Sequence, residues 1–154
     1  MRILVTGHLG YIGTVAVPIL QAAGHEVVGL DTDLYAHGTL GDPATLPDVP
    51  NIGKDVRDVE VDDLEGIDAV VHLAALSNDP RGDLDPQLTY EINYLATVRL
   101  ARLARDAGVR RFVFSSSCSN YGASSGSGLL DEDGRQNPVQ GCRIDTCTAD
   151  DGKR

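Results

Sequence analysis

The stretch Val5-Thr6-Gly7-His8-Leu9-Gly10-Tyr11-Ile12-Gly13 decides the fold of this chain. An apolar run at residues 3–5 leads into three glycines spaced G-x-x-G-x-x-G, and a helical pattern follows at once. Gly7 permits a tight turn, Gly10 lets backbone amides approach a phosphate, and Gly13 lets the helix pack closely on the strand. A bound pyrophosphate needs this order of elements, because the amides and dipole of a helix start hold an anion. The stretch predicts a dinucleotide site; the alternative is a tight turn without a ligand.

The bulk composition limits the classes of protein to consider. The 154 residues suffice for one domain with a real core, and the chain is 42% hydrophobic and 23% charged. A formal net charge of -10 leaves no basic excess for nucleic acid or an anionic membrane surface. The first apolar run is too short for a signal peptide, and no stretch is long enough to span a bilayer.

The cysteines argue against a metal or disulfide scaffold. Cys118, Cys142 and Cys147 are odd in number and form no C-x-x-C pair, and no histidine lies close to them in sequence. We therefore expect no metal site and a reducing cytoplasm.

The region after the turn alternates between helical and strand patterns. We predict a strand over residues 2–6 and a helix over about 11–23. The apolar positions that keep helical spacing in this helix are Ile12, Val15, Ile19 and Ala23. The next strand, residues 25–31, ends in Asp31, roughly twenty residues beyond the glycines, where a carboxylate accepts hydrogen bonds from the adenosine ribose. Such a carboxylate repels a 2′-phosphate, which favours NAD over NADP; the alternative is a solvated loop acid.

Two further strands are expected in the middle of the chain. Residues 51–58 read as a short strand ending in an acidic turn, where Asp55 caps either the adenine amino group or the following helix. Residues 68–75 form a nearly continuous apolar run, which suits a central strand buried on both faces of a parallel sheet. Within it we interpret His72 as a packed, hydrogen-bonded histidine rather than a catalytic base. The small side chains of Ala74 and Ala75 let the backbone approach a cofactor.

A long helix and a last strand complete the pattern. Asp85-Pro86 is a helix start, and the helix is expected to run to about residue 107 with one apolar stripe for the sheet and a second face, containing Tyr90 and Tyr94, for a partner helix. Asn93 in mid-helix indicates either a tertiary hydrogen bond or an exposed polar residue. Residues 111–117 read as another buried strand running into serines at its carboxyl end, the edge where open parallel sheets bind ligands.

Together these elements predict an α/β, Rossmann-like, doubly wound parallel sheet, and their motifs resemble a known family. The motifs are Thr6-Gly7-x-x-Gly10-x-x-Gly13, Asp31, Asp55-Val56-Arg57-Asp58, His72-Leu73-Ala74-Ala75, Asn93 and Phe114-Ser115-Ser116-Ser117-Cys118-Ser119-Asn120-Tyr121-Gly122. They occur in the order seen in extended short-chain dehydrogenases/reductases, and the chain resembles their NAD-dependent epimerase/dehydratase branch over roughly residues 1–138.

The resemblance implies NAD as cofactor, a nucleotide-sugar as substrate and transient hydride transfer from a sugar carbon. It matches Ser117 to the family's catalytic Ser/Thr and places Ser115 and Ser116 beside the nicotinamide. The candidate cofactor-binding residues are Gly7, Leu9, Gly10, Tyr11, Ile12, Gly13, Asp31, Asp33, Asp55, Val56, Leu73, Ala74, Ala75, Asn93, Ser115 and Ser116.

The sequence departs from the family at its catalytic pair. The family's Tyr-x-x-x-Lys is absent, because the only lysines, Lys54 and Lys153, follow Pro50 and Ala149 at that spacing. We therefore expect an NAD-binding domain over residues 1–138, an unstructured tail over 139–154 and no substrate domain. Three interpretations stay open: a nucleotide-sugar epimerase or dehydratase completed by a partner chain, a truncated NAD(H)-binding module without catalysis, and a non-catalytic interaction protein that uses the second face of the helix at 86–107. Separately, we expect the chain to form homo-oligomers through this helix.

Overall fold

The computed structural model describes residues 1–34, 48–77 and 85–116. The chain divides into two units, Met1–Ser115 and Ser116–Arg154, and the fold given below is that of the first. The predicted boundary at residue 138, the predicted tail over 139–154 and the candidate catalytic Ser117 lie outside the described residues.

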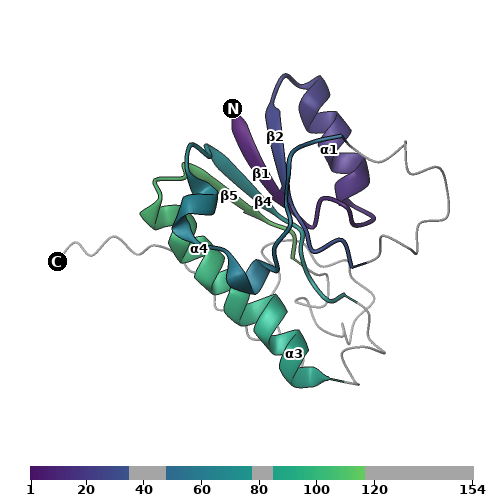
Figure 1. Cartoon of the computed structure of the whole chain (residues 1–154), viewed down its shortest axis with the longest axis vertical. Coiled ribbons are helices and arrows are strands. Elements are labelled where there is room, and N and C mark those ends of the chain that lie inside the picture. Colours follow the sequence, from purple (N-terminus) through teal and green to yellow (C-terminus); the bar gives the residue numbers. More distant parts are fainter. Residues whose placement is uncertain (35–47, 78–84, 117–154) are drawn as a thin grey trace, which may run out of the picture. The chain divides into compact units, whose positions relative to one another are not determined.

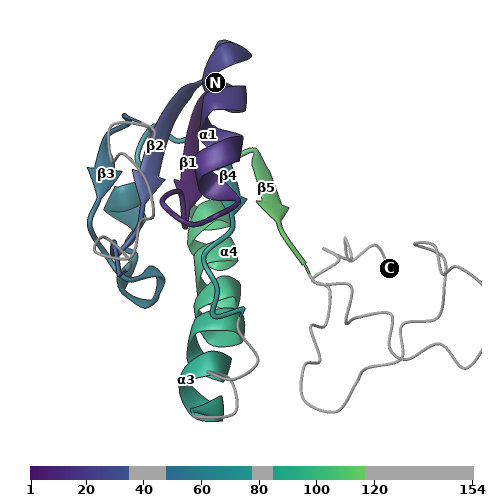
Figure 2. The same ribbon diagram turned by 90° about the vertical axis from the view of Figure 1, so that its right-hand side faces the viewer.

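The centre of the first unit is a parallel sheet of five strands in the order β3-β2-β1-β4-β5 (Figures 1 and 2). The strands are β1 (Arg2–Thr6), β2 (Glu26–Leu30), β3 (Asn51–Ile52), β4 (Ala69–His72) and β5 (Arg111–Phe114). The chain steps outward from β1 to β3 and then crosses back to β4 on the other side of β1. This reversal confirms the predicted doubly wound topology and places a switch point between β1 and β4, where ligands bind in such sheets.

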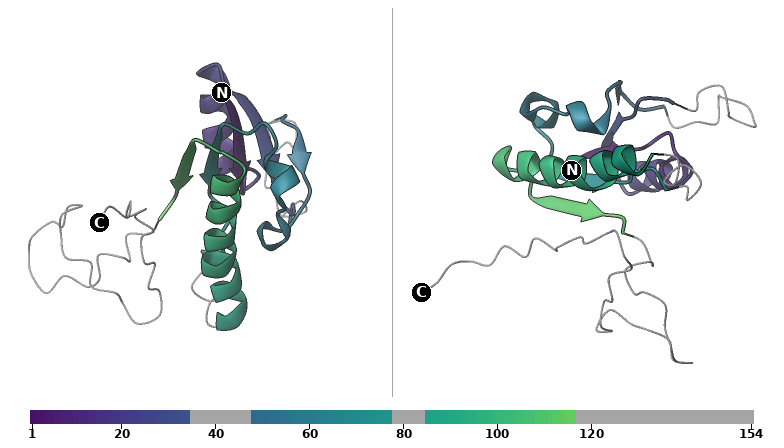
Figure 3. Two further views of the ribbon diagram at one scale, coloured as in Figure 1. Left: turned by 90° about the vertical axis from the view of Figure 1, so that its left-hand side faces the viewer. Right: turned by 90° about the horizontal axis from the view of Figure 1, so that it is seen from below.

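Helices cover the sheet on both faces, as the doubly wound pattern requires. Helix α1 (Gly13–Ala22) connects β1 to β2, and two short 3₁₀ helices, η3 (Val56–Asp58) and η4 (Val61–Leu64), connect β3 to β4. Before β5 the segments α3 (Pro86–Tyr90), η5 (Glu91–Ala96) and α4 (Thr97–Asp106) follow one another and form a single rod (Figures 2 and 3). The predicted start of this helix is confirmed, because the Asp85 side chain accepts a hydrogen bond from the Leu88 amide at 2.9 Å.

Alternate residues of the central strands supply two apolar layers. On one face Leu4, Val28 and Val70 pack in one cluster with Leu100 and Ala104 of α4. On the other face a second cluster contains Ile3, Val5, Val17, Val27 and Ala69, with Val17 contributed by α1. Because successive side chains of β1 point to opposite faces, this strand contributes to both clusters. Burial of each Ile, Leu or Val side chain stabilises the fold by about 1.5–3 kcal/mol.

The rotation of α1 differs from what its apolar pattern suggests. The side chains of Ile12, Val15 and Ile19 are 57%, 60% and 64% exposed, and Val17 is fully buried instead. The cause is Gly13, where a Cβ would lie 2.5 Å from the backbone of Gly7 and His8. This close approach fixes which side of the helix faces the sheet, so the apolar positions that identified the helix point away from it.

The prediction of a buried last strand is wrong for one of its faces. Phe112 packs against the core on the α4 side, but Val113 is 54% exposed on the opposite side. β5 pairs with β4 alone among the described strands, and α1 packs over β1 and β2 rather than over β5. The outward residues of β5 therefore have no cover within the described residues.

Candidate dinucleotide-binding site

The turn after β1 has the tight geometry that its glycines predict. Gly7 adopts a φ of +72°, and its amide donates a hydrogen bond to the Leu30 carbonyl at 2.8 Å. A Cβ on Gly7 would lie 2.8 Å from the backbone nitrogen of Ala74. Both its conformation and this contact exclude a side chain, so Gly7 lets the turn run close between β2 and the end of β4.

The start of α1 is suited to an anion. No side chain caps this end of the helix, and its first turn carries no acidic residue. The amide groups at a helix start lack partners within the helix and carry the positive end of the helix dipole. A pyrophosphate is the kind of group that satisfies them.

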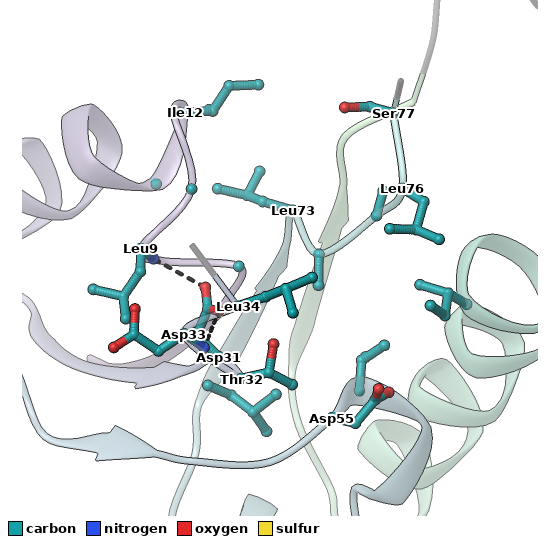
Figure 4. Close-up of a pocket in the computed structure, with 18 of the residues that line it drawn as sticks. Leu9, Ile12, Asp31, Thr32, Asp33, Leu34, Asp55, Leu73, Leu76 and Ser77 are labelled. Carbon is teal, nitrogen blue, oxygen red and sulfur yellow. Dashed lines mark hydrogen bonds between the residues drawn. The ribbon is translucent and has the colours of Figure 1, made fainter. Parts of the chain in front are cut away.

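A cavity of about 590 Å³ opens beside this turn, at the carboxyl ends of the strands (Figure 4). Such a volume accommodates a nucleotide-sized ligand. The predicted residues that line it are Gly7, Leu9, Gly10, Tyr11, Ile12, Gly13, Asp31, Asp33, Asp55, Val56, Leu73, Ala74 and Ala75.

The cavity also has lining residues that sequence reasoning did not predict. They are Leu30, Thr32, Leu34, Lys54, Leu76, Ser77 and Ile92. Each lies within two residues of a predicted residue in sequence, so extending the predicted segments by a residue or two would have found them. Ile92 adjoins Asn93 but belongs to the apolar stripe of the long helix, where the sequence pattern alone indicates a core residue.

Asp31 ties β2 to the glycine-rich turn. Its Oδ2 accepts a hydrogen bond from the Leu9 amide at 3.1 Å, and its Oδ1 accepts one from the Asp33 amide at 2.9 Å (Figure 4). The side chain is therefore held in place at the cavity and is not a solvated loop acid. The Asp33 backbone has a φ of +53°, which turns the chain back at this point.

Asp55 caps the helix that follows it, one of its two predicted roles. Its carboxylate accepts bonds from the Arg57 amide at 2.8 Å and from the Arg57 guanidinium at 3.0 and 2.9 Å. The Arg57 side chain holds the pKa of Asp55 below its ordinary value. The carboxylate still borders the cavity, where adenine recognition stays a prediction.

His72 lies at the centre of a buried relay of hydrogen bonds, which confirms its interpretation as a packed histidine. Thr6 Oγ1 lies 2.6 Å from His72 Nδ1, and Thr97 Oγ1 lies 2.8 Å from His72 Nε2. Thr97 also donates its hydroxyl proton to the Asn93 carbonyl at 2.9 Å, so it can only accept from His72. The proton of the imidazole is thereby assigned to Nε2, and Nδ1 accepts the hydroxyl proton of Thr6.

These hydrogen bonds through His72 and Thr6 fix Leu73 and Ala74, which form one wall of the cavity. The Thr6 oxygen accepts bonds from the amides of Leu73 and Ala74 at 3.3 and 3.2 Å. Burial lowers the pKa of His72 to about 4, which keeps the ring neutral near pH 7. A neutral ring is the only form that fits, because a proton on Nδ1 would face the hydroxyl proton of Thr6.

Asn93 has the tertiary role that its place in mid-helix suggested. Its Oδ1 accepts a bond from the Leu76 amide and its Nδ2 donates to the Leu76 carbonyl, both at 2.8 Å. The residue lies in the π-helical segment η5, a form often found at functional sites. Asn93 does not line the cavity itself, but it holds Leu76, which does.

Ser115 follows β5 at the carboxyl edge of the sheet. The Ser115 amide donates to the His72 carbonyl at 3.2 Å, which continues the pairing of β5 with β4. Neither Ser115 nor Ser116 lines the cavity as described, so their contact with a nicotinamide stays a prediction.

Two negative findings concern the described residues only. Among residues 1–34, 48–77 and 85–116, no group of three His, Cys, Asp or Glu side chains is arranged to hold a metal ion. In the same part of the chain, no helix has the length and apolar character needed to cross a membrane.

The sequence matches the NAD dependent epimerase/dehydratase family over residues 3–144. It is 40% identical over 129 residues to a UDP-glucose 4-epimerase of Mycolicibacterium smegmatis and 36% identical over 128 residues to one of Lactobacillus helveticus. The matches cover 76% and 79% of this chain but 39% and 37% of those relatives. This chain therefore corresponds to less than half the length of either relative.

Two of the solved structures that match are also UDP-glucose 4-epimerases, and this chain again covers less than half of each. The Thermus thermophilus UDP-glucose 4-epimerase in complex with NAD matches with a TM-score of 0.77 and 32% identity, over 90% of this chain and 45% of that one. A UDP-glucose-4-epimerase from Stenotrophomonas maltophila, with bound NAD and formylated UDP-arabinopyranose, matches with a TM-score of 0.77 and 29% identity, over 90% and 43% of the two chains.

Proposed function

Because this chain belongs to the NAD dependent epimerase/dehydratase family, we propose that it binds NAD in the cavity at the carboxyl ends of its strands. The pyrophosphate lies on the turn of Gly7 to Gly13 and the start of α1. The adenosine ribose lies at Asp31, and the adenine lies beside Asp55 and Val56. The observation that carries the proposal is the fixed carboxylate of Asp31, which the Leu9 amide holds at the cavity next to the uncapped helix start.

The residues present fit such a group. Side chains at Gly7 or Gly13 would occupy space already filled by backbone, and the start of α1 beyond the turn has no side-chain cap. The carboxylate of Asp31 suits the two hydroxyls of an unmodified ribose and repels a 2′-phosphate. NAD, when bound, supplies a nicotinamide that can accept a hydride. The chain's own residues bind and orient it, through the turn, Asp31 and the wall held by Asn93.

Calorimetric titration tests this proposal. We expect the wild-type chain to release heat and to melt at a higher temperature in the presence of NAD. Asp31→Ala removes the ribose acceptor and should weaken binding by about tenfold or more. Gly53→Ala is a suitable control, because a Cβ there meets nothing within 4 Å. No heat and no thermal shift at millimolar NAD would contradict the proposal.

The chemical step is a separate question. The relatives are UDP-glucose 4-epimerases, but the 154 residues here contain no Tyr-x-x-x-Lys pair. A tyrosine acts as a base near neutral pH only when nearby positive charge lowers its pKa from about 10. We therefore infer that this chain by itself binds NAD(H) without converting a nucleotide-sugar. Epimerisation of UDP-glucose or UDP-galactose by the pure chain would overturn this inference.

Self-association through the helix at 86–107 is a further part of the proposal. One face of this rod packs against the sheet through Ala96, Leu100 and Ala104. On the rod's other side Tyr90 and Leu95 are about half exposed, and the rings of Tyr90 and Tyr94 stack at 5.0 Å. A second copy of the rod would bury these side chains. From the charge and the cysteine content of the chain we also propose a cytoplasmic location and no binding of nucleic acid.

A further inference from the structure

His8 is a residue of the glycine-rich turn that neither the motif nor the cavity explains. It is not among the residues that line the cavity, and it is only 1% exposed. Its Nδ1 is buried without a hydrogen-bond partner among the described residues. Because buried polar groups generally have a partner, the unpaired Nδ1 indicates that packing contributes to the position of this ring.

The ring of His8 lies on the backbone of Gly29 in β2. A Cβ at position 29 would lie 2.4 Å from each of Cε1, Nδ1 and Nε2 of His8. The ring thus occupies the space that a side chain at position 29 would take. The backbone of His8 is equally close to the helix, since a Cβ on Gly13 would lie 2.5 Å from its Cα and its carbonyl oxygen. His8 is therefore wedged between β2 and α1.

The wedge lies beside the bond that positions the ribose acceptor. His8 directly precedes Leu9, and Gly29 is two residues before Asp31. The hydrogen bond from the Leu9 amide to Asp31 Oδ2, at 3.1 Å, joins these two segments. The ring of His8 therefore packs against one of the two segments that this hydrogen bond joins, and its own backbone belongs to the other.

The contact between the His8 ring and Gly29 is one of packing. Burial lowers the pKa of His8, although Asp31, the Leu30 backbone and Asp33 oppose this effect. The adjoining helix α1 carries no charged residue, and Tyr11 in the turn is exposed. The contact with Gly29 thus rests on the packing of the ring, whose pKa burial holds below its ordinary value.

We propose that His8 and Gly29 form an interlocking pair that holds Asp31 at the Leu9 amide, and that this pair determines how strongly the site prefers NAD to NADP. The proposal rests on NAD binding at this cavity. A carboxylate fixed at the ribose repels a 2′-phosphate, whereas a carboxylate that can turn away repels it less. His8 thereby acts as a positioning residue for cofactor selectivity.

Fluorescence titration with NADH and NADPH near neutral pH tests the pair. The proteins are the wild type, His8→Ala, Gly29→Ala, the double variant and the control Gly53→Ala. We expect each single substitution to lower the preference for NADH over NADPH by about tenfold, the effect of one lost hydrogen bond. In the double variant the methyl group at position 29 takes space vacated by the ring, so the preference should return to within about threefold of the wild type. Gly53→Ala should match the wild type.

The outcomes separate this proposal from NAD binding itself. If the wild type binds neither nucleotide, the proposed function fails. If the wild type binds NADH but the preference is equal in all variants, or the two single effects simply multiply in the double variant, the interlock is wrong. Should Gly29→Ala fail to fold while the double variant folds and binds NADH, the interlock is supported. Should every alanine variant except the control unfold, the milder His8→Asn takes their place. A lower preference for NADH over NADPH in this variant supports the interlock, and an unchanged preference contradicts it.

Discussion

Acidification should destabilise the fold through His72. In the unfolded chain its pKa has the ordinary value of 6.5, and in the fold burial lowers that pKa to about 4. Between these two pH values the unfolded chain binds more protons than the folded chain. The contribution of His72 to the free energy of unfolding is therefore complete above pH 6.5 and is lost as the pH falls toward 4. Each pKa unit corresponds to about 1.4 kcal/mol, which gives a loss of about 3 kcal/mol by pH 4.

The structure explains why the proton is rejected. Both ring nitrogens are already used, with Nδ1 accepting from Thr6 and Nε2 donating to Thr97. A second ring proton has no acceptor, because Thr6 Oγ1 directs its own proton at Nδ1 and accepts two amide bonds. Protonation thus breaks the relay and releases the wall of the cavity.

Urea unfolding of the wild type and of His72→Asn at several pH values between about 4 and 7 measures this effect. Asparagine keeps an acceptor near the position of Nδ1 but does not titrate. The variant should be less stable than the wild type near pH 7, because the bond to Thr97 is lost, and the difference should shrink by about 3 kcal/mol on acidification. Other groups, including His8 and the carboxylates, titrate in both proteins and cancel in this comparison. Parallel pH dependences for the two proteins would refute the reasoning.

Three further predictions concern packing and polar contacts. Gly13→Ala places a methyl group 2.5 Å from the backbone of the turn and should cost at least about 2 kcal/mol of unfolding free energy, seen as a lower melting temperature. Asn93→Ala removes two bonds to the Leu76 backbone and should cost about 2 kcal/mol in urea unfolding. Its control on the same rod, Gln87→Ala, removes one exposed bond and should change stability by less than about 0.5 kcal/mol. Leu95→Glu should lower self-association in sedimentation without lowering the melting temperature; a wild type that is monomeric at all concentrations would count against the proposed interface.

Local chemistry made much of the fold predictable. The glycine spacing, the carboxylate of Asp31 and the cap at Asp85 are signals that neighbouring residues carry by themselves. The long apolar run around β4 indicated a central strand correctly, because a strand covered on both faces needs no polar alternation. The run before Ser115 indicated a strand as well, but not that Val113 lies on an open face.

The sequence by itself determined the strand, glycine turn and helix, the alternation of elements and hence the doubly wound parallel sheet. Each of these follows from backbone preferences and periodicity within a few residues. Only the tertiary structure decided the rotation of α1, the proton position on His72 and the contact of His8 with Gly29. These depend on residues far apart in the chain, such as Thr6 and His72 at a separation of 66. Their contact follows from the register of β1 on β4, which no local pattern specifies.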